Sequence, residues 1–353
     1  MSTTYRIVVI PGDGIGNEVM PEAIRVLETV SSKFDFDFTF DEKDWSCERY
    51  HKTGAMMPED GLKQISNYDS ILLGAVGSPG VPDHVSLWGL LIPIRREFQQ
   101  YVNLRPVRLF EGMPCPLVGR KPGDIDFIIV RENNEGEYSE VGGRLYAGTD
   151  QELTVQQSIF TREGTDRIMR YAFDLAKTRE RKHVTSATKS NGIIHSMPYW
   201  DERFEKISGD YPEVTTDKFH IDILTAHFVR NPDWFDVVVG SNLFGDILSD
   251  LGPAVTGTIG IAPGANINPT SDYPSMFEPV HGSAPDIAGR GICNPIGEIW
   301  SAAMMLDHLG EHSAAANIIT AIETIIRDSD IKTPDMGGNA TTSELGQAVT
   351  DAL

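Results

Sequence analysis

Short apolar runs alternate with amphipathic stretches along almost the whole chain. Runs rich in β-branched residues predict buried strands at Arg6–Ile10, Asp69–Leu73, Asp126–Val130, His183–Ser186 and Phe235–Val239. Apolar positions three and four residues apart predict helices over Val19–Val30, Ile168–Ala176 and Ile318–Ile326. Such alternation is typical of an α/β fold with a mostly parallel sheet.

Two local patterns add to this picture. Residues 137–160 contain the pair Gly142-Gly143, the single Gly148 and short polar–apolar segments without helical periodicity, which predicts a β-ribbon. The ribbon either pairs with another subunit or forms a simple surface hairpin. Thr341 and Glu344 have the spacing of a capping box and predict the start of the last helix.

Size and composition limit the architecture and the partners. A chain of 353 residues is longer than one hydrophobic core usually serves, so we expect two lobes. With 30 Lys and Arg against 51 Asp and Glu, the formal charge of −21 argues against binding to nucleic acids or anionic membranes. Three widely spaced cysteines argue against a disulfide framework or a zinc cluster. The chain runs directly into a strand without a signal pattern, and no apolar stretch is long enough to span a membrane, so we expect a cytoplasmic protein.

A glycine-rich turn follows the first predicted strand. It reads Pro11-Gly-Asp-Gly-Ile-Gly16, but a Rossmann fingerprint needs glycine at position 17, where this chain has Asn17. The sequence therefore predicts a tight strand–helix turn and not the pyrophosphate cradle of a Rossmann fold.

Three carboxylates indicate a metal site. Asp246 and Asp250 lie four residues apart, so a helix would project both from one face, where they repel unless a cation lies between them. Oxygen ligands suit Mg²⁺ or Mn²⁺; the alternative is a solvated acidic helix face. Asp222 lies in an apolar, strand-like run, where a buried carboxylate needs a partner, and is the third candidate ligand.

Basic residues indicate an anionic substrate. Arg95, Arg105 and Arg131 each lie at or near the end of an apolar segment, and guanidinium groups bind carboxylates in a bidentate manner. Each alone fits a surface ion pair, whereas three in so acidic a chain favour a small polyanion. Lys189 follows a strand and is a candidate general base, or simply an exposed lysine. Asp286, in the loop after Glu278, would favour NAD over NADP by facing a free ribose hydroxyl.

Taken together, six motifs resemble, in sequence and in order, those of the metal-dependent β-decarboxylating dehydrogenases, the family of isopropylmalate, isocitrate and tartrate/D-malate dehydrogenases. The motifs are PGDGIG, NLRP, VREN-x-EGEY, TKSN, NLFGDILSD and EPVHGSAPDIAG. The resemblance implies that Arg95, Arg105 and Arg131 bind substrate carboxylates and that Tyr138 and Lys189 form the acid/base pair. It further implies divalent metal ligands at Asp222, Asp246 and Asp250, with Asp222 also counted among the catalytic residues. The implied NAD site consists of Ile15, His281, Gly282, Ser283, Ala284, Asp286 and Asn294.

The family resemblance also implies an architecture. The fold is the isocitrate/isopropylmalate dehydrogenase-like α/β fold, with two lobes sharing a mostly parallel sheet, and is not a Rossmann fold. Residues 1–104 and 257–353 would form a discontinuous cofactor-binding domain, and residues 105–256 the dimerisation, substrate and metal domain. The active site would be completed across a homodimer, with Lys189 and Asp222 supplied by the partner, and the ribbon at about 137–160 would clasp the two subunits.

The segment before Arg95 distinguishes members of the family. Isopropylmalate enzymes carry a glutamate where this chain has Trp88, and isocitrate enzymes carry serine and asparagine where it has Gly89 and Leu91. The string from Asp83 to Gly89 is similar instead to the tartrate and D-malate subgroup, which implies oxidative decarboxylation of D-malate to pyruvate and CO₂ with activity on L-tartrate and meso-tartrate. Trp88 and Leu91 would line the pocket around substrate C3, although Trp88 could also pack in a core. NAD, Mg²⁺ or Mn²⁺, and K⁺ are the implied cofactors. The alternatives are a 3-isopropylmalate dehydrogenase and a non-catalytic regulatory subunit of an isocitrate dehydrogenase.

Overall fold

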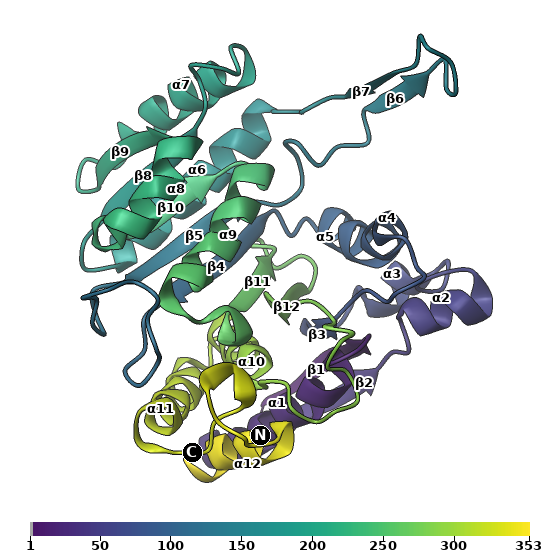
Figure 1. Cartoon of the computed structure of the whole chain (residues 1–353), viewed down its shortest axis with the longest axis vertical. Helices are drawn as coiled ribbons and strands as arrows, with labels where there is room; N and C mark the ends of the chain where they lie inside the picture. The colour runs from purple at the N-terminus through teal and green to yellow at the C-terminus, as the bar shows by residue number, and fades with distance from the viewer. Residues whose placement is uncertain (1–2) are drawn as a thin grey trace.

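The computed structural model describes residues 3–353 and shows one ten-stranded sheet with a separate two-stranded ribbon (Figure 1). The order in the large sheet is β2-β1-β3-β12-β11-β4-β5-β10-β8-β9. Its strands are β1 (Thr3–Gly12), β2 (Phe36–Glu42), β3 (Ser70–Ala75), β4 (Val102–Arg108), β5 (Asp126–Glu132), β8 (His183–Thr188), β9 (Thr215–His220), β10 (Val237–Gly240), β11 (Pro263–Ile267) and β12 (Ser275–Pro279). The ribbon pairs β6 (Gly142–Leu145) with β7 (Leu153–Gln156).

The sheet is parallel towards both edges and antiparallel in its centre. The pairings from β2 to β12 and from β5 to β9 are parallel, whereas β12–β11, β11–β4 and β4–β5 are antiparallel. Strand β4 connects the two halves because it pairs with β11 on one side and with β5 on the other. The predicted boundary at residue 104 falls inside this strand, and the division into two domains stays a prediction. Residues 1 and 2 of the predicted cofactor-binding domain lie outside the described residues.

Helices cover the sheet in two groups, one at each end of the molecule (Figure 1). The group around the parallel strands β1–β3 and β12 comprises α1 (Gly16–Phe34), α2 (Cys47–Thr53), α3 (Gly61–Ile65), α4 (Asp83–Ser86), α5 (Ile92–Glu97), α10 (Ile296–His308), α11 (His312–Asp328) and α12 (Thr342–Asp351). The group around β5 and β8–β10 comprises α6 (Arg162–Thr178), α7 (Ser196–Ser208), α8 (Ile221–Arg230) and α9 (Asn242–Thr256). Helix α12 packs on α1, so the two ends of the chain belong to one lobe.

Most of the predicted elements are confirmed. All five predicted strands and all three predicted helices are present, and Thr341 and Glu344 form the capping box of α12. The ribbon within 137–160 is also present and extends away from the body of the molecule (Figure 1). A main core runs under both lobes, and a smaller one lies between β1, β3 and α5.

The prediction for the segment around Asp222 was wrong. His220 ends β9, and the next residues begin helix α8, so Asp222 lies in the first turn of a helix and not in a buried strand. The alternation of apolar and polar residues in this short run fits either element, and the exposed carboxylate near the helix N-terminus favours the helix. No helix within residues 3–353 is long and apolar enough to cross a lipid bilayer.

Candidate active site

The three predicted arginines converge on the antiparallel centre of the sheet. Arg105 extends from β4, Arg131 from β5 and Arg95 from α5, and their exposed fractions are only 7%, 3% and 6%. They are therefore not surface ion pairs. Burial lowers the pKa of Arg131 and lowers that of Arg105 to about 10, because desolvation disfavours the charged form.

Two carboxylates balance these cations. Glu278 accepts hydrogen bonds from Arg95 Nη2 and Asn266 Nδ2, both at 2.7 Å. Asp246 pairs with Arg131 Nη1. Arg95 Nε is buried and has no hydrogen-bond partner among residues 3–353, so it remains available to an acceptor that the protein does not supply. Buried donors of this kind suit an anionic ligand.

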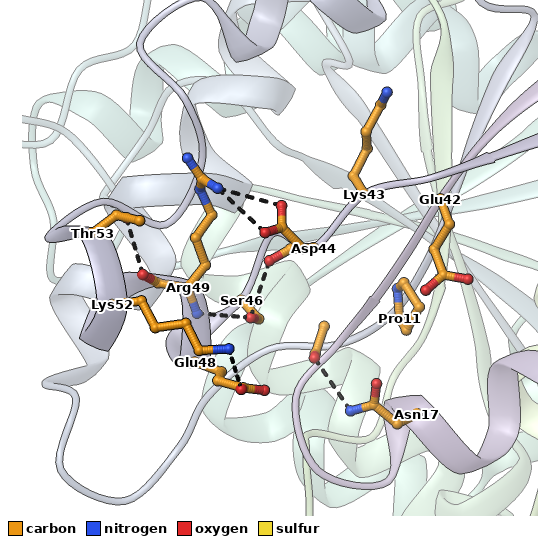
Figure 2. Close-up of a pocket in the computed structure, with 11 residues that line it drawn as sticks. Pro11, Asn17, Glu42, Lys43, Asp44, Ser46, Glu48, Arg49, Lys52 and Thr53 are labelled. Carbon is orange, nitrogen blue, oxygen red and sulfur yellow. Dashed lines mark hydrogen bonds and ion pairs between the residues drawn. The ribbon is translucent and has the colours of Figure 1, made fainter.

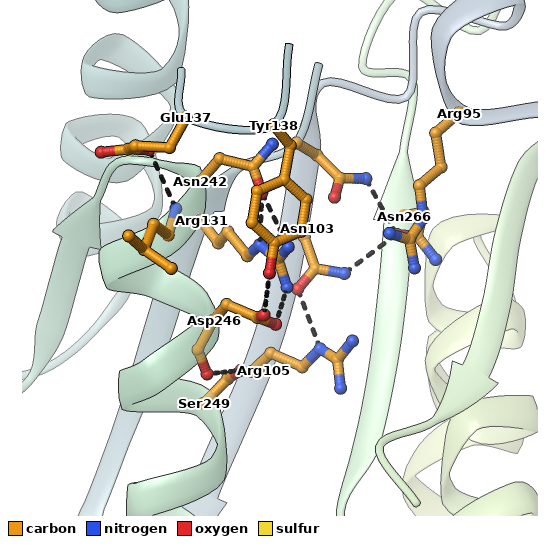
Figure 3. Close-up of polar contacts among 12 residues, drawn as sticks. Arg95, Asn103, Arg105, Arg131, Glu137, Tyr138, Asn242, Asp246, Ser249 and Asn266 are labelled. Carbon is orange, nitrogen blue, oxygen red and sulfur yellow. Dashed lines mark hydrogen bonds and ion pairs between the residues drawn. The ribbon is translucent and has the colours of Figure 1, made fainter. Parts of the chain in front are cut away.

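Asparagine side chains bind two of the arginines in two separate groups of hydrogen bonds, one around Arg105 and one around Arg131 (Figure 3). Asn103 accepts from Arg105 Nε at 2.8 Å and donates to Asn266 Oδ1 at 2.9 Å. Asn242 Oδ1 accepts from Arg131 Nη2 at 2.7 Å. Asn103 and Asn242 lie inside two of the sequence motifs but were not predicted to have a role, and Asn266 was not predicted at all. The available signal was a polar side chain within an apolar strand, which has to be paired when it is buried.

Tyr138 lies beside Asp246 and Arg131. Its hydroxyl donates to Asp246 Oδ2 at 2.6 Å, and the guanidinium carbon of Arg131 lies 5.3 Å from the centre of its ring. The pKa of Tyr138 is raised to about 12, mainly because the side chain is buried and in second place because it donates a hydrogen bond to Asp246. At neutral pH this phenol therefore keeps its proton and is chemically a donor.

Helix α9 places Asp246 next to Arg131 because the helix backbone closely approaches strand β5 at Gly245. At Gly245 a Cβ atom would lie 2.5 Å from Arg131 Cβ, so a larger residue would push the helix away from β5. Glu137 holds the start of the same helix by accepting from Ser241 Oγ at 2.8 Å and Leu243 N at 3.0 Å. The loop that carries Tyr138 and the helix that carries Asp246 are thereby joined (Figure 3).

Asp250 lies one turn further along α9, as its spacing from Asp246 predicts. Burial and the negative charge of Asp246 raise the pKa of Asp250. This like-charge pair of oxygen donors is chemically suited to a hard divalent cation. No group of three His, Cys, Asp or Glu side chains within residues 3–353 is arranged to hold a metal ion, so a single chain supplies two of the three predicted ligands to one place.

Asp222, the third predicted ligand, pairs instead with Lys189. Lys189 Nζ lies 2.7 Å from Asp222 Oδ1, and this hydrogen bond is the main cause of the lowered pKa of Asp222. The two residues follow the neighbouring parallel strands β8 and β9, which explains their contact. Asp222 is exposed, contrary to the prediction of a buried carboxylate.

The residues predicted to bind NAD lie along one loop against the glycine-rich turn. Ile15 N donates to Ser283 O at 2.9 Å, and Ile15 packs with Ala284 in a small apolar cluster. Gly14 has a φ of +55°, and a Cβ there would lie 2.1 Å from Ser283 O, so this approach requires glycine. Gly282 and Asp286 are exposed on the same loop.

A polar side chain lies near each end of this loop, His281 after β12 and Asn294 before α10. Asn294 Nδ2 donates to Asp335 Oδ2 at 3.0 Å. His281 Nε2 is buried without a partner among the described residues, and burial lowers the pKa of this imidazole. This nitrogen is therefore available to a ligand group that the protein does not supply.

Trp88 and Leu91 lie on the π-helical segment Leu87–Leu91 that precedes α5. Leu91 is half-buried and packs on the smaller core. Trp88 is also half-buried, but its ring faces the guanidinium of Arg96, 4.7 Å from the ring centre. The indole is therefore covered by a cation and does not belong to either large core cluster.

A separate charged hollow of about 200 Å³ lies between the glycine-rich turn and α2 (Figure 2). Four of its charged groups pair with each other, Arg49 with Asp44 at 3.3 Å and Lys52 with Glu48. None of the predicted substrate or metal residues lines it. It is therefore not the candidate active site.

Comparisons with known proteins agree with this geometry. Residues 6–349 match the family model described as isocitrate/isopropylmalate dehydrogenase. The chain is 60% identical over 356 aligned residues to the D-malate dehydrogenase [decarboxylating] of Escherichia coli strain K12, covering 99% of this chain and 98% of that protein. It is 59% identical to the tartrate dehydrogenase/decarboxylase of Pseudomonas putida with the same coverage. The crystal structure of isocitrate dehydrogenase from Methylococcus capsulatus superposes with a TM-score of 0.88 at 32% identity and covers 99% of both chains. The predicted fold is confirmed.

Proposed function

Because the chain belongs to the isocitrate/isopropylmalate dehydrogenase family, we propose that it catalyses the NAD-dependent oxidative decarboxylation of D-malate to pyruvate and CO₂. We extend the proposal to oxidation of L-tartrate and decarboxylation of meso-tartrate, as the name of the Pseudomonas putida relative suggests. The observation that carries the proposal is the set of three buried arginines around Tyr138 and Asp246, which suits a small dicarboxylate.

In the proposed reaction each group of side chains has a separate role. Arg95, Arg105 and Arg131 bind and orient the substrate carboxylates. Tyr138, which is neutral at physiological pH, holds a proton at Oη that it can deliver to substrate C3. The partner subunit's Lys189 takes the proton of the substrate C2 hydroxyl, and the arginines keep the acid aligned with Tyr138 and with this lysine.

Asp246 and Asp250 would hold a divalent cation, Mg²⁺ or Mn²⁺, with the partner subunit's Asp222 as the third carboxylate. The donor set contains only oxygen, as these cations prefer. When bound, the cation withdraws electrons from the substrate oxygens, and NAD accepts the hydride. Members of the family use a nicotinamide cofactor and a divalent metal; the choice of NAD, and a need for K⁺, belong to the proposal.

The nucleotide would lie along the loop that contacts Ile15, with Asp286 near the ribose. Asp286 is exposed at the edge of this loop and carries the negative charge that disfavours a 2′-phosphate. His281, Gly282, Ser283, Ala284 and Asn294 complete the proposed site.

A homodimer explains two features of the described chain. Lys189 and Asp222 pair with each other, away from the Tyr138 cluster, and so would serve the active site of the other subunit. Large apolar side chains are exposed on the ribbon and on the outer faces of α8 and α9 and would be covered by a second copy. They are Val141, Leu145, Tyr146, Leu153, Val155, Ile223, Val229 and Ile247. All three cysteines are free thiols, which fits the proposed cytoplasmic location.

The strongest alternative is a 3-isopropylmalate dehydrogenase. The half-buried indole of Trp88 argues against it, because it fills space next to α5 and leaves room at C3 for hydrogen or hydroxyl better than for a branched alkyl group. The non-enzymatic alternative is a regulatory subunit. Retention of Tyr138, Lys189 and the three aspartates argues against that role.

The test is a side-by-side assay of the purified chain with NAD, Mn²⁺ and K⁺. NADH formation is followed with D-malate, L-tartrate, meso-tartrate and 3-isopropylmalate, and pyruvate is assayed separately. We expect the highest kcat/KM with D-malate. A higher kcat/KM with 3-isopropylmalate would establish the alternative enzyme, and no turnover of any of the four acids would favour the regulatory subunit.

A further inference from the structure

Arg96, which has no place in the proposed chemistry so far, contacts both the specificity segment and the segment that carries Tyr138. It lies on α5, next to Arg95, with 29% of its side chain exposed. Its guanidinium stacks over Trp88 at 4.7 Å, and its Nη2 donates to the main-chain oxygen of Tyr138 at 2.9 Å. Its Nη1 donates to Glu140 at 2.7 Å. One side chain thus joins two segments that are about 50 residues apart.

Tyr138 is consequently held at both ends. The hydroxyl end is held by Asp246 of α9, and the main-chain end by Arg96 of α5. In the proposed function Asp246 would hold a divalent cation, and its hydrogen bond with the phenol would then be weaker. The contact from Arg96 does not involve any proposed metal ligand.

We propose that Arg96 is a positioning residue that sets the place of Tyr138 over substrate C3 and couples it to the Trp88 pocket. This inference rests on the proposed function. After CO₂ leaves, the electron pair of the C2–C3 enolate forms the new C3–H bond, the Tyr138 O–H bond breaks, and the phenolate remains near Arg131. Only this proton transfer requires the Tyr138 hydroxyl at a fixed distance from C3, because hydride transfer from C2 comes earlier.

The contact with Glu140 does not by itself explain the arrangement. The Glu140 side chain is 70% exposed, and exposed ion pairs contribute little to stability. The stack on Trp88 and the hydrogen bond to the Tyr138 carbonyl are the better-shielded contacts, and they orient the planar guanidinium from two sides. An arginine used only for surface charge would not need either.

The chain contains a matched control for this side chain. Arg6 stacks over Tyr68 at 4.4 Å and donates Nη1 to the main-chain oxygen of Asn67 at 3.3 Å, remote from the candidate site. The variants Arg96→Met and Arg6→Met therefore remove the same two kinds of contact in different places. Arg96→Lys keeps a cation over Trp88 and one donor.

The experiment is stopped-flow measurement of NADH formation from D-malate, compared with steady-state turnover. In Arg96→Met we expect the first hydride transfer at the wild-type rate within about 3-fold, and a kcat lower by about 10- to 100-fold, so that a burst of NADH precedes slow turnover. Arg96→Lys should recover part of kcat, and Arg6→Met should match the wild type in both phases.

Each other outcome overturns the inference. An equal loss of the burst rate and of kcat in Arg96→Met would show a general structural defect, and unchanged kcat would show that Arg96 does not position Tyr138. If wild-type protein forms no NADH from D-malate but does so from 3-isopropylmalate, the proposed function fails, and the inference about C3 of D-malate fails with it. The wild-type trace therefore separates the two failures.

Discussion

Replacing Glu298 by glutamine should remove part of the pH dependence of the folding stability. Glu298 lies in the first turn of α10 with 0% of its surface exposed, and neither carboxylate oxygen has a hydrogen-bond partner within residues 3–353. Burial, with a smaller contribution from the charge of Glu278, raises the pKa of Glu298 well above its usual value. Burial tends to raise the pKa of Glu278, but the charges of Arg95 and Arg105, with hydrogen bonds from Asn266 and Arg95, together lower it, so Glu278 stays ionised.

The sign and size of the effect follow from linkage. In the unfolded chain a glutamate has a pKa of about 4.3, so above about pH 5 the unfolded state has lost a proton that the folded state still holds. Stability therefore falls as pH rises, by about 1.4 kcal/mol per pH unit for as long as Glu298 stays protonated. Glutamine cannot release this proton, so the variant lacks this slope.

The assay is urea unfolding of wild type and Glu298→Gln at pH 5, 6 and 7 and a fixed protein concentration. The difference in unfolding free energy should shift in favour of the variant as pH rises, by at most about 1.4 kcal/mol per pH unit, whatever constant offset the buried amide adds. Glu48→Gln is the control, because Glu48 is exposed and its contact with Lys52 lowers its pKa, so its difference from wild type should stay constant. A constant difference for Glu298→Gln as well would refute the reasoning.

Three further predictions concern the active site. Lys189→Ala or Tyr138→Phe should abolish most turnover while NAD affinity, measured by fluorescence titration, stays within about 2-fold; equal loss of NAD binding would contradict the assigned roles. Refolding an equimolar mixture of these two variants should restore about a quarter of wild-type activity if each site takes Tyr138 from one subunit and Lys189 from the other, and no recovery would mean that each chain forms its own site. Removal of divalent cations by a chelator should stop NADH formation and Mn²⁺ should restore it, with Asp250→Asn requiring a higher Mn²⁺ concentration; activity that survives chelation would exclude the metal role of Asp246 and Asp250.

Hydrophobic periodicity and the order of the motifs predict much of the fold from the sequence alone. The strands from Arg6 to Ile10 and from Asp126 to Val130 are continuous apolar runs, and such runs are buried whichever neighbours cover them. The capping box at Thr341 depends only on contacts three residues apart. Elements of this kind are specified locally, so their positions can be read from the sequence.

The prediction of a strand around Asp222 was wrong because the local sequence does not specify the element there. A run of five residues with alternating polarity satisfies a strand and the first turn of a helix equally well. The choice is made by β9, which ends at His220, and by Lys189, which follows the neighbouring strand and pairs with the carboxylate. Both influences are tertiary, since β8 and β9 lie side by side only in the folded sheet.

The sequence by itself determined the chemical inventory of this protein: which arginines, aspartates, tyrosine and lysine are present, in motifs ordered as in one enzyme family. Only the tertiary structure decided how they are used. It buried Arg105 and Arg131 on adjacent antiparallel strands, paired Lys189 with Asp222 elsewhere, and laid Arg96 between Trp88 and Tyr138. The physical reason is that burial and long-range contacts set the charge state and direction of a side chain, and neither is encoded in its immediate neighbours.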